Sequence, residues 1–370
     1  MHPSAATTRR GLRYLAVVAA VAVTAATTLT ACGDDNSGSN AGGGGNGCDT
    51  AGKKLNLAFV YASTTQNPFQ EMALGAQAAA DDDGNVNLQL SAPTGIDGPK
   101  EVSLFQAAAR TATDGVAYMT VTPDLFVRPL NTATDAGVPV IAVDAGPPPG
   151  TKVKTFVANS NTKLGELLGE SFVAQNPKAD GTVVLGNDIP SLQLLVQRLN
   201  GVQNVLKAKL PNLKIVGPLD SKSEPTENFN AWKSIVQAHP DAVAFLGVGG
   251  QDGVSLPLIA KQTGRTFLAA SADLPPEAVQ AVKDGQLFAL SSPEHWMKGY
   301  IAMHLLIEAK RKCTKVPEGW WNSGNLLVDK TNVDDILARQ KSPESRKAWF
   351  KKEIDKQLAN PPLSPMDQAN

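Results

Sequence analysis

The residues of this 370-residue chain that are best suited to chemistry are polar side chains at the ends of apolar runs. The segment STTQNPFQEM follows the run LNLAFVY and places hydroxyl and amide groups next to an aromatic ring. A later run, VPVIAV, leads directly into Asp144, whose carboxylate can accept hydrogen bonds from two hydroxyl groups. Ligands of open α/β sheets bind at the carboxyl ends of the strands. These positions therefore predict a binding site for a small molecule.

The sequence lacks the motifs that catalysis or a cofactor requires. It contains neither a Gly-x-Ser-x-Gly nor a Gly-x-x-x-x-Gly-Lys motif, and its histidines have no metal-ligand spacing. The loop GVGGQDG resembles a dinucleotide fingerprint, but Asp252 occupies the place of the last glycine. We therefore expect no enzyme activity, no cofactor and no metal ion. The four histidines are His2, His239, His295 and His304.

Two matched series of strand-like runs determine the expected fold. The runs begin at residues 55, 86, 115 and 138, and again at 182, 213, 242 and 266. Successive starts are 31, 29 and 23 residues apart in the first series and 31, 29 and 24 apart in the second. Helical segments rich in Ala and Leu separate the runs. This pattern predicts an α/β protein with two similar Rossmann-like lobes, each a parallel sheet flanked by helices.

The chain continues after both series are complete. A long amphipathic helix, EHWMKGYIAMHLLIEAKRK, and a final strand, GNLLVDK, follow the second series. These extra elements indicate that the chain crosses back between the lobes, so that several segments form the hinge. We expect residues 341–370 to form an exposed charged helix and a proline-rich tail.

The N-terminus carries an export signal that does not belong to the fold. Arg9, Arg10 and Arg13 precede an apolar run that ends in LTAC. LTAC resembles a bacterial lipobox, which predicts a signal peptide over residues 1–31 and lipidation of Cys32. Cleavage after an alanine, without a lipid, is the alternative. Residues 32–53 predict a flexible tether, and TRRGLR leaves both general and twin-arginine export open.

Charge and cysteine content limit the remaining possibilities. A formal net charge of -1 offers no basic face for the phosphates of nucleic acid. Cys48 and Cys313 remain after Cys32 is lipidated. In an oxidising compartment these two cysteines are candidates for a disulfide, and two unpaired thiols are the alternative.

Several motifs together resemble one family. The order of lipobox, tether and two α/β lobes, with NPF after the first strand and VPVIAVD after the fourth, is similar to type I periplasmic solute-binding proteins. The resemblance is to the ribose- and simple-sugar-binding branch that serves ABC importers. It extends from about residue 54 to about residue 330 and includes AHPDAVAFL, QDGVSL and AVKDGQL.

The resemblance implies a cleft between two lobes that closes on one small molecule. Lobe I would comprise residues 54–158 and 294–323, and lobe II residues 159–293 and 324–340. Three crossing segments, near 157–161, 292–293 and 322–324, would form the hinge.

The resemblance also implies which residues contact the ligand. Three of the implied contacts also have a structural alternative: Asn67 could cap a helix, Phe69 could lie in the core, and Asp273 could cap the helix that follows it. Trp296 could stack on a sugar ring or pack in the core. The implied contacts are Ser63, Asn67, Phe69, Asp144, Gln251 and Asp273, with Arg198, Glu294, His295 and Trp296 as further candidates.

The expected ligand is a sugar, polyol or cyclitol. Pentose binders continue with Arg after the aspartate that ends the fourth strand, whereas Ala145 follows Asp144 here. The resemblance implies a lipid-anchored receptor that delivers its ligand to an ABC permease. The oligomeric state stays open, and a monomer is the default expectation for a receptor that closes on its ligand. A sensory receptor of the same fold is the alternative. An effector-binding transcription regulator would need an N-terminal helix-turn-helix and a basic surface, whereas this chain has an export signal and a net charge of -1. No motif in the sequence argues for an exported enzyme.

Overall fold

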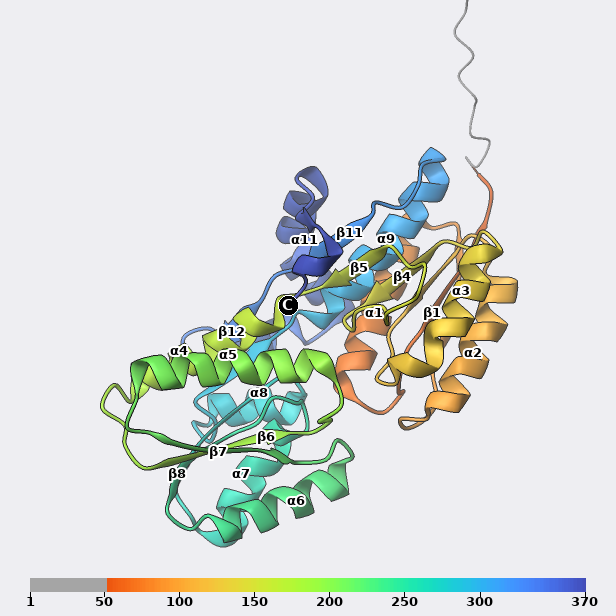
Figure 1. The fold of residues 1–370 in the computed structure, drawn as a ribbon. Helices are drawn as coiled ribbons and strands as arrows, with labels where there is room; N and C mark the ends of the chain where they lie inside the picture. The colour runs from red at the N-terminus through yellow and green to blue at the C-terminus, as the bar shows by residue number, and fades with distance from the viewer. Residues whose placement is uncertain (1–51) are drawn as a thin grey trace, which may run out of the picture. The chain divides into compact units, whose positions relative to one another are not determined.

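The structure is a computed structural model that describes residues 52–370. It contains a seven-stranded sheet, ordered β13-β11-β5-β4-β3-β1-β2, and a six-stranded sheet, ordered β12-β10-β9-β8-β6-β7. Helices flank both sheets (Figure 1). We call the part around the first sheet lobe I and the part around the second lobe II. The predicted α/β fold with two similar lobes is confirmed.

Lobe I is formed by the first third of the chain and by segments that return to it later. Its strands are parallel except β13, which pairs antiparallel with β11. The elements of lobe I are β1 Leu55–Val60, α1 Asn67–Asp83, β2 Val86–Ser91, α2 Gly98–Thr111, β3 Gly115–Tyr118, η1 Pro123–Phe126, α3 Val127–Asp135, β4 Val140–Val143, β5 Thr155–Ala158, α9 His295–Lys312, β11 Gly319–Asn322, α11 Pro343–Ala359, β13 Leu363–Ser364 and η2 Met366–Gln368.

Lobe II repeats the arrangement with the middle of the chain. Its strands are parallel except β12, which pairs antiparallel with β10. The elements of lobe II are α4 Asn161–Gln175, β6 Thr182–Asn187, α5 Gln193–Lys209, β7 Lys214–Asp220, α6 Pro225–Ala238, β8 Ala242–Leu246, α7 Asp252–Thr263, β9 Leu268–Ala272, α8 Pro276–Lys283, β10 Ala289–Ser292, β12 Leu326–Val328 and α10 Val333–Arg339.

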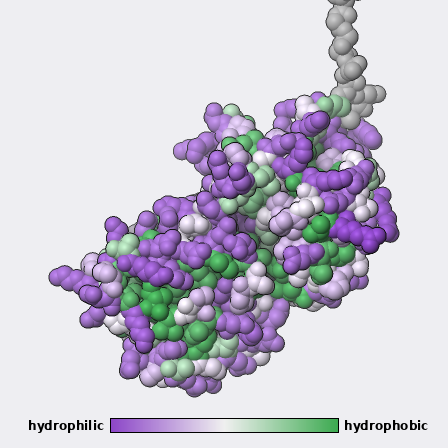
Figure 2. Space-filling model, viewed as in Figure 1, coloured by the Kyte–Doolittle hydropathy of each residue, from purple (hydrophilic) through white to green (hydrophobic). Residues whose placement is uncertain are grey.

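The central strands are buried because helices cover both faces of each sheet. Strands β3 and β4, with the sequences GVAY and VIAV, are buried at every residue, as is typical of parallel strands that are covered on two sides. In the edge strand β7, by contrast, four of the seven residues are exposed and the other three are partly buried. On the face of lobe II that Figure 1 and Figure 2 show, hydrophobic side chains gather around β7, between α5 and α6.

The chain crosses back and forth between the lobes. The crossings connect β5 to α4, β10 to α9, and β11 to β12. A fourth crossing connects α10 of lobe II to α11 of lobe I. This fourth segment was not expected.

The C-terminal segment is not the exposed helix and tail that the sequence predicts. Phe350 and Ile354 of α11 are buried in the core with residues of α1 and α9. Strand β13 pairs with β11, and the backbone carbonyl of Asn370 accepts a hydrogen bond from the N–H of Asn161 at 2.5 Å. Apolar positions among the many charges of α11 explain the difference, because they allow one face of this helix to pack.

Several predictions concern residues outside the described part of the chain. The signal peptide, Cys32 and nearly all of the tether precede residue 52. Cys313 takes part in a disulfide, but Cys48 is not among the described residues, so their pairing stays a prediction. Within residues 52–370, none of the helices is long and apolar enough to cross a membrane.

Glycines bring two helix pairs into direct backbone contact, one in each lobe. In lobe I, a Cβ on Gly75 of α1 would lie 1.8 Å from the carbonyl oxygen of Trp296, and one on Gly299 of α9 would lie 1.9 Å from that of Met72. In lobe II, a Cβ on Gly165 of α4 would lie 1.8 Å from the carbonyl oxygen of Arg198. These contacts determine where α9 and α5 place their side chains.

We expect Gly299→Ala to lower the free energy of unfolding by about 1–3 kcal/mol, because the new methyl group would overpack the contact between α1 and α9. Urea denaturation measures the change. Gly146→Ala is the control, because a Cβ there would lie 3.8 Å from the ring of Phe156. Equal stability of the two variants would contradict the backbone contact.

Candidate functional site

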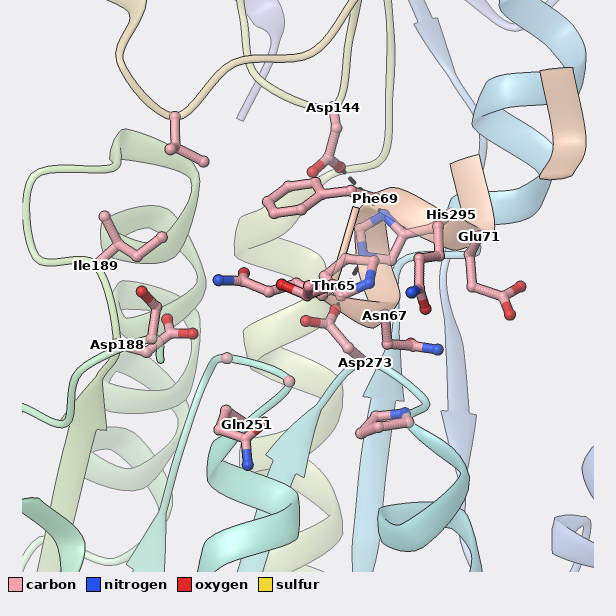
Figure 3. Close-up of a pocket in the computed structure, with 18 of the residues that line it drawn as sticks. Thr65, Asn67, Phe69, Glu71, Asp144, Asp188, Ile189, Gln251, Asp273 and His295 are labelled. Atoms are coloured by element: carbon pink, nitrogen blue, oxygen red, sulfur yellow. Dashed lines mark hydrogen bonds and ion pairs between the residues drawn. The ribbon is translucent and has the colours of Figure 1, made fainter. Parts of the chain in front are cut away.

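A cavity of about 620 Å³ is lined by residues of both lobes (Figure 3). Lobe I contributes the start of α1 and the residue that follows β4. Lobe II contributes the loops that follow β6, β8 and β9, together with the first turns of α5. In each lobe the cavity therefore lies at the carboxyl ends of the parallel strands, where open α/β sheets bind ligands.

Seven of the ten predicted contact residues line this cavity. They come from segments that are far apart in the chain, and the fold gathers them on the two sides of one space. Their contact with a ligand stays a prediction. These residues are Asn67, Phe69, Asp144, Arg198, Gln251, Asp273 and His295.

Asn67 does not cap α1, as the sequence had suggested it could. The residue before the helix is Gln66, and Asn67 is the first helical residue. The side-chain oxygen of Asn67 is buried without a hydrogen-bond partner. This amide is therefore available to a molecule in the cavity.

Ser63 does not line the cavity. Its hydroxyl donates to the carbonyl of Thr94 at 2.9 Å and accepts from the N–H of Thr65 at 3.1 Å. Ser63 thus stabilises the loop that precedes α1.

Glu294 and Trp296 also lie outside the cavity. Glu294 accepts hydrogen bonds from Arg339 at 3.0 and 3.1 Å. Trp296 is buried and stacks on the ring of Phe350, with centroids 5.0 Å apart and an angle of 4° between the planes. The core interpretation of Trp296 therefore agrees with the structure, and stacking on a sugar does not.

Asp144 and Asp273 occupy equivalent places in the two lobes. Asp144 directly follows β4, Asp273 directly follows β9, and both have a backbone φ of 64°. Few residues other than glycine adopt this left-handed conformation, although aspartate tolerates it better than most. Asp273 is not a helix cap, because Pro275 is the N-cap of α8.

His295, at the start of α9, lies between these two carboxylates. Its Nε2 is 3.0 Å from Oδ1 of Asp273, and its Nδ1 is 3.7 Å from Oδ1 of Asp144. Lys298, one turn further along α9, donates a hydrogen bond to Asp144. Nη1 of Arg198 lies 3.6 Å from Oδ1 of Asp273. Carboxylates and basic groups thus alternate beside the cavity and connect the two lobes.

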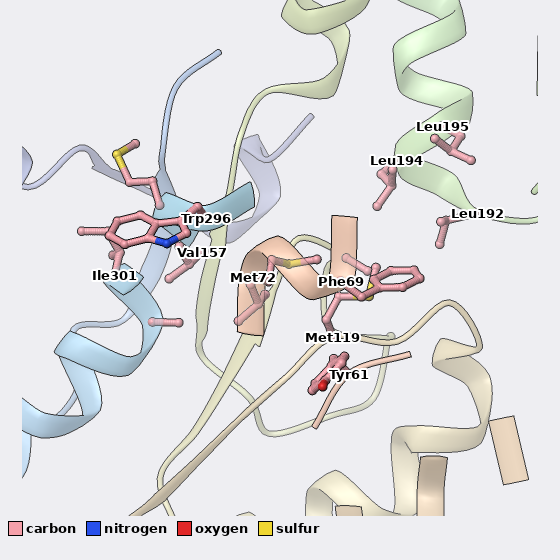
Figure 4. Packing of buried hydrophobic residues seen from close by; sticks show 14 of the residues in the cluster. Tyr61, Phe69, Met72, Met119, Val157, Leu192, Leu194, Leu195, Trp296 and Ile301 are labelled. Carbon is pink, nitrogen blue, oxygen red and sulfur yellow. The ribbon is translucent and has the colours of Figure 1, made fainter. Parts of the chain in front are cut away.

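Apolar side chains form a second wall. Phe69 and Met119 of lobe I and Leu192, Leu194 and Leu195 of lobe II are buried in one cluster and also line the cavity. Figure 4 shows the leucines at the start of α5 across from Phe69. An aromatic ring and aliphatic groups suit the C–H face of a small ligand, while polar groups determine its orientation.

The sequence argument missed Asp188 and Arg346. Asp188 directly follows β6, so the rule that led to Asp144 would also have found it. Arg346 lines the cavity from α11 and forms a 3.2 Å ion pair with Glu71 of α1. No local signal identifies Arg346, because α11 reads as an exposed helix.

Asp252, which replaces the last glycine of the fingerprint-like loop, has a structural role. It is fully buried and accepts hydrogen bonds from Trp232 at 2.6 Å, Asn228 at 2.8 Å and the N–H of Gly249 at 3.0 Å. Among residues 52–370, no group of three or more His, Cys, Asp or Glu residues is placed to hold a metal ion.

Comparison with known proteins identifies the family of this chain. Residues 57–312 match the family model described as a periplasmic binding protein domain. The chain is a member of the periplasmic binding protein family.

A curated relative of this periplasmic binding protein is the xylose/arabinose-binding protein of Sulfolobus acidocaldarius. It is 24% identical over 265 residues, which are 67% of this chain and 64% of the archaeal protein. The match therefore spans slightly less than two thirds of that relative's length.

Solved structures show the same fold. A glucose-galactose binding protein from Geobacillus stearothermophilus has a TM-score of 0.68 and 21% identity, over 76% of this chain and 99% of its own. A solute-binding protein from Burkholderia graminis, solved with D-arabinose, has a TM-score of 0.69 and 20% identity, over 76% of this chain and 96% of its own.

Neighbouring charges determine the ionisation of the buried carboxylates in this periplasmic binding protein. Burial alone would raise the pKa of Asp144, but Lys298, His295 and Arg198 outweigh it and lower the pKa to about 2. Burial likewise opposes the lowered pKa of Asp273, which results from His295 and Arg198. Burial lowers the pKa of Lys298 against the pull of Asp144, because an ammonium group is also costly to bury.

We expect Lys298→Met to lower the free energy of unfolding by about 3–5 kcal/mol at neutral pH, because it removes the closest of the basic groups that stabilise the buried carboxylate of Asp144. In the wild type, the contribution of Asp144 is complete above the unfolded pKa of about 3.9 and is lost as the pH falls to about 2. The difference between variant and wild type should therefore shrink as the pH falls, because Asp144 takes up its proton at a higher pH in the variant than in the wild type.

Urea denaturation between pH 3 and 7 measures this difference. Lys351→Met is the control, because it removes an exposed ion pair with Asp355 and should change the stability by less than about 0.5 kcal/mol. A Lys298→Met deficit that does not change with pH would argue against the ion pair.

Proposed function

We propose that this protein is an extracytoplasmic receptor that captures a small sugar or polyol in the cavity between its lobes and delivers it to an ABC importer. The observation that carries the proposal is the arrangement of polar groups from both lobes around one cavity that also has an apolar wall. The names of the relatives support a sugar: one binds xylose and arabinose, and another was solved with D-arabinose.

Binding would be coupled to closure of the lobes. Asn67 and Asp144 belong to lobe I, whereas Gln251 and Asp273 belong to lobe II, so a ligand that contacts all four favours the closed state. Nε2 of Gln66, which lines the cavity, donates a hydrogen bond to Glu224 of lobe II at 3.0 Å. A transporter can then recognise the closed state, and no chemical change of the ligand is needed.

A sugar at about 100 times its Kd should stabilise the protein by about 2.7 kcal/mol, which a thermal-shift screen detects. Xylose, arabinose, glucose, galactose and a set of polyols and cyclitols form the panel, with amino acids as a contrasting class. A response confined to hydroxylated compounds supports the proposal. Absence of any response to them would refute it.

Asn67→Ala should weaken binding of the best ligand about fivefold, because one buried hydrogen bond contributes on the order of 1 kcal/mol. Calorimetry measures the Kd. Gln77→Ala is the matched control on the same helix, since Gln77 bonds to Asp81 and does not line the cavity. Equal effects of the two substitutions would contradict the proposed placement of the ligand.

We further propose that a lipid on Cys32 holds the receptor at the outer face of the membrane. The lipobox-like sequence LTAC supports this. Cys32→Ser should move the protein, expressed in a bacterial host, from the membrane fraction to the soluble fraction. Retention of the variant with the membrane would contradict the anchor.

A further inference from the structure

Three carboxylates meet at the glycine-rich loop on the lobe II side of the cavity. A Cβ on Gly249 would lie 1.9 Å from Oδ2 of Asp188, and one on Gly250 would lie 3.2 Å from Oδ2 of Asp273. The N–H of Gly249 donates to Asp252 at 3.0 Å. These glycines have no side chains, which leaves room for the carboxylates to lie against the backbone of the loop.

Two of the three carboxylates already have partners. Asp252 accepts hydrogen bonds from neutral donors and does not line the cavity. Asp273 lies near Arg198 and His295. Arg198 is itself engaged, because it also donates to the carbonyl of Val248 at 2.5 Å and to Asn161 at 3.1 Å.

Asp188 lines the cavity without such a partner. Within residues 52–370, no Lys, Arg or His lies within ion-pair distance of it, and its Oδ1 is buried without a hydrogen bond. Figure 3 shows Asp188 beside Ile189 on the lobe II side. The other carboxylates that line the cavity, apart from Glu277 at its exposed rim, each lie near a basic group.

The surroundings of Asp188 favour a positive charge. Burial raises the pKa of Asp188 well above its usual value, and the charges of Asp252 and Asp273 raise it further against the opposing charge of Arg198. When the lobes close over the cavity, the carboxylate of Asp188 must therefore either pair with a cation or take up a proton. The described residues offer no metal site, but an organic ammonium needs fewer ligands than a metal ion.

We propose that the ligand carries a protonated amine that pairs with Asp188, in addition to the hydroxyl groups that the other polar residues bind. The preferred ligand class is thus an amino sugar or an amino-polyol. This inference rests on the proposed function, because it assigns one more contact in the same cavity.

The test compares matched ligands that differ in one group. Calorimetry on the purified full-length protein at neutral pH measures the Kd of D-glucose and D-glucosamine, of D-galactose and D-galactosamine, and of the two N-acetylated amino sugars. For at least one pair, we expect the amine to bind at least tenfold more tightly than both uncharged forms. This comparison needs only the wild-type protein.

Asp188→Asn then tests the residue. In this variant, the ratio of the Kd values of the hydroxyl and amino ligands should fall to about one, because the amide has no charge. Glu277→Gln, which neutralises the carboxylate at the exposed rim of the same cavity, should keep the ratio. Thermal melting confirms that both variants are folded.

The outcomes separate the two proposals. If neutral sugars bind as tightly as their amino forms in the wild type, the amine is wrong and the proposed function stands. If the preference for the amine survives in Asp188→Asn, the assignment to Asp188 is wrong. If no member of any pair binds and the wider sugar and polyol panel is also negative, the proposed function fails as well.

Discussion

The burial of carboxylates at strand ends is the constraint on which the rest of the structure depends. A carboxylate that is removed from water needs a hydrogen-bond donor or a positive charge nearby. For Asp144 and Asp273 these partners are Lys298, His295 and Arg198, and the first two come from α9. Helix α9 must therefore lie where its first turn reaches both lobes.

Glycine contacts hold the helices in those places. Gly75 and Gly299 let the backbones of α1 and α9 touch, and this contact places Lys298 and His295 beside the cavity. Gly165 of α4 does the same for α5 at the backbone of Arg198. Packing within each lobe and electrostatics between the lobes are thus determined by the same helices.

The repetition of the two lobes also explains the form of the site. Asp144 and Asp273 follow equivalent strands with the same left-handed backbone, so the equivalent strand of each lobe presents a carboxylate to the space between them. The lobes differ elsewhere: Phe69 of lobe I lies across from leucines of α5, and only lobe II has the glycine loop that accommodates Asp188. The two lobes share one backbone arrangement but carry different side chains, so the two walls of the cavity differ.

The sequence by itself determined the two-lobe α/β fold, because buried parallel strands and their spacing are local patterns. It also placed Asn67, Asp144 and Gln251 at strand ends, where the cavity lies. It could not exclude Ser63 or Trp296, because whether a side chain turns toward a ligand or into a core depends on distant neighbours such as Thr94 and Phe350.

Only the tertiary structure showed that α11 packs on lobe I, and that Asp188 meets Asp252 and Asp273 at one loop. These three aspartates are up to 85 residues apart in the chain. Their mutual repulsion and their need for a positive partner arise from distances in space, which residue types and spacing along the chain do not specify.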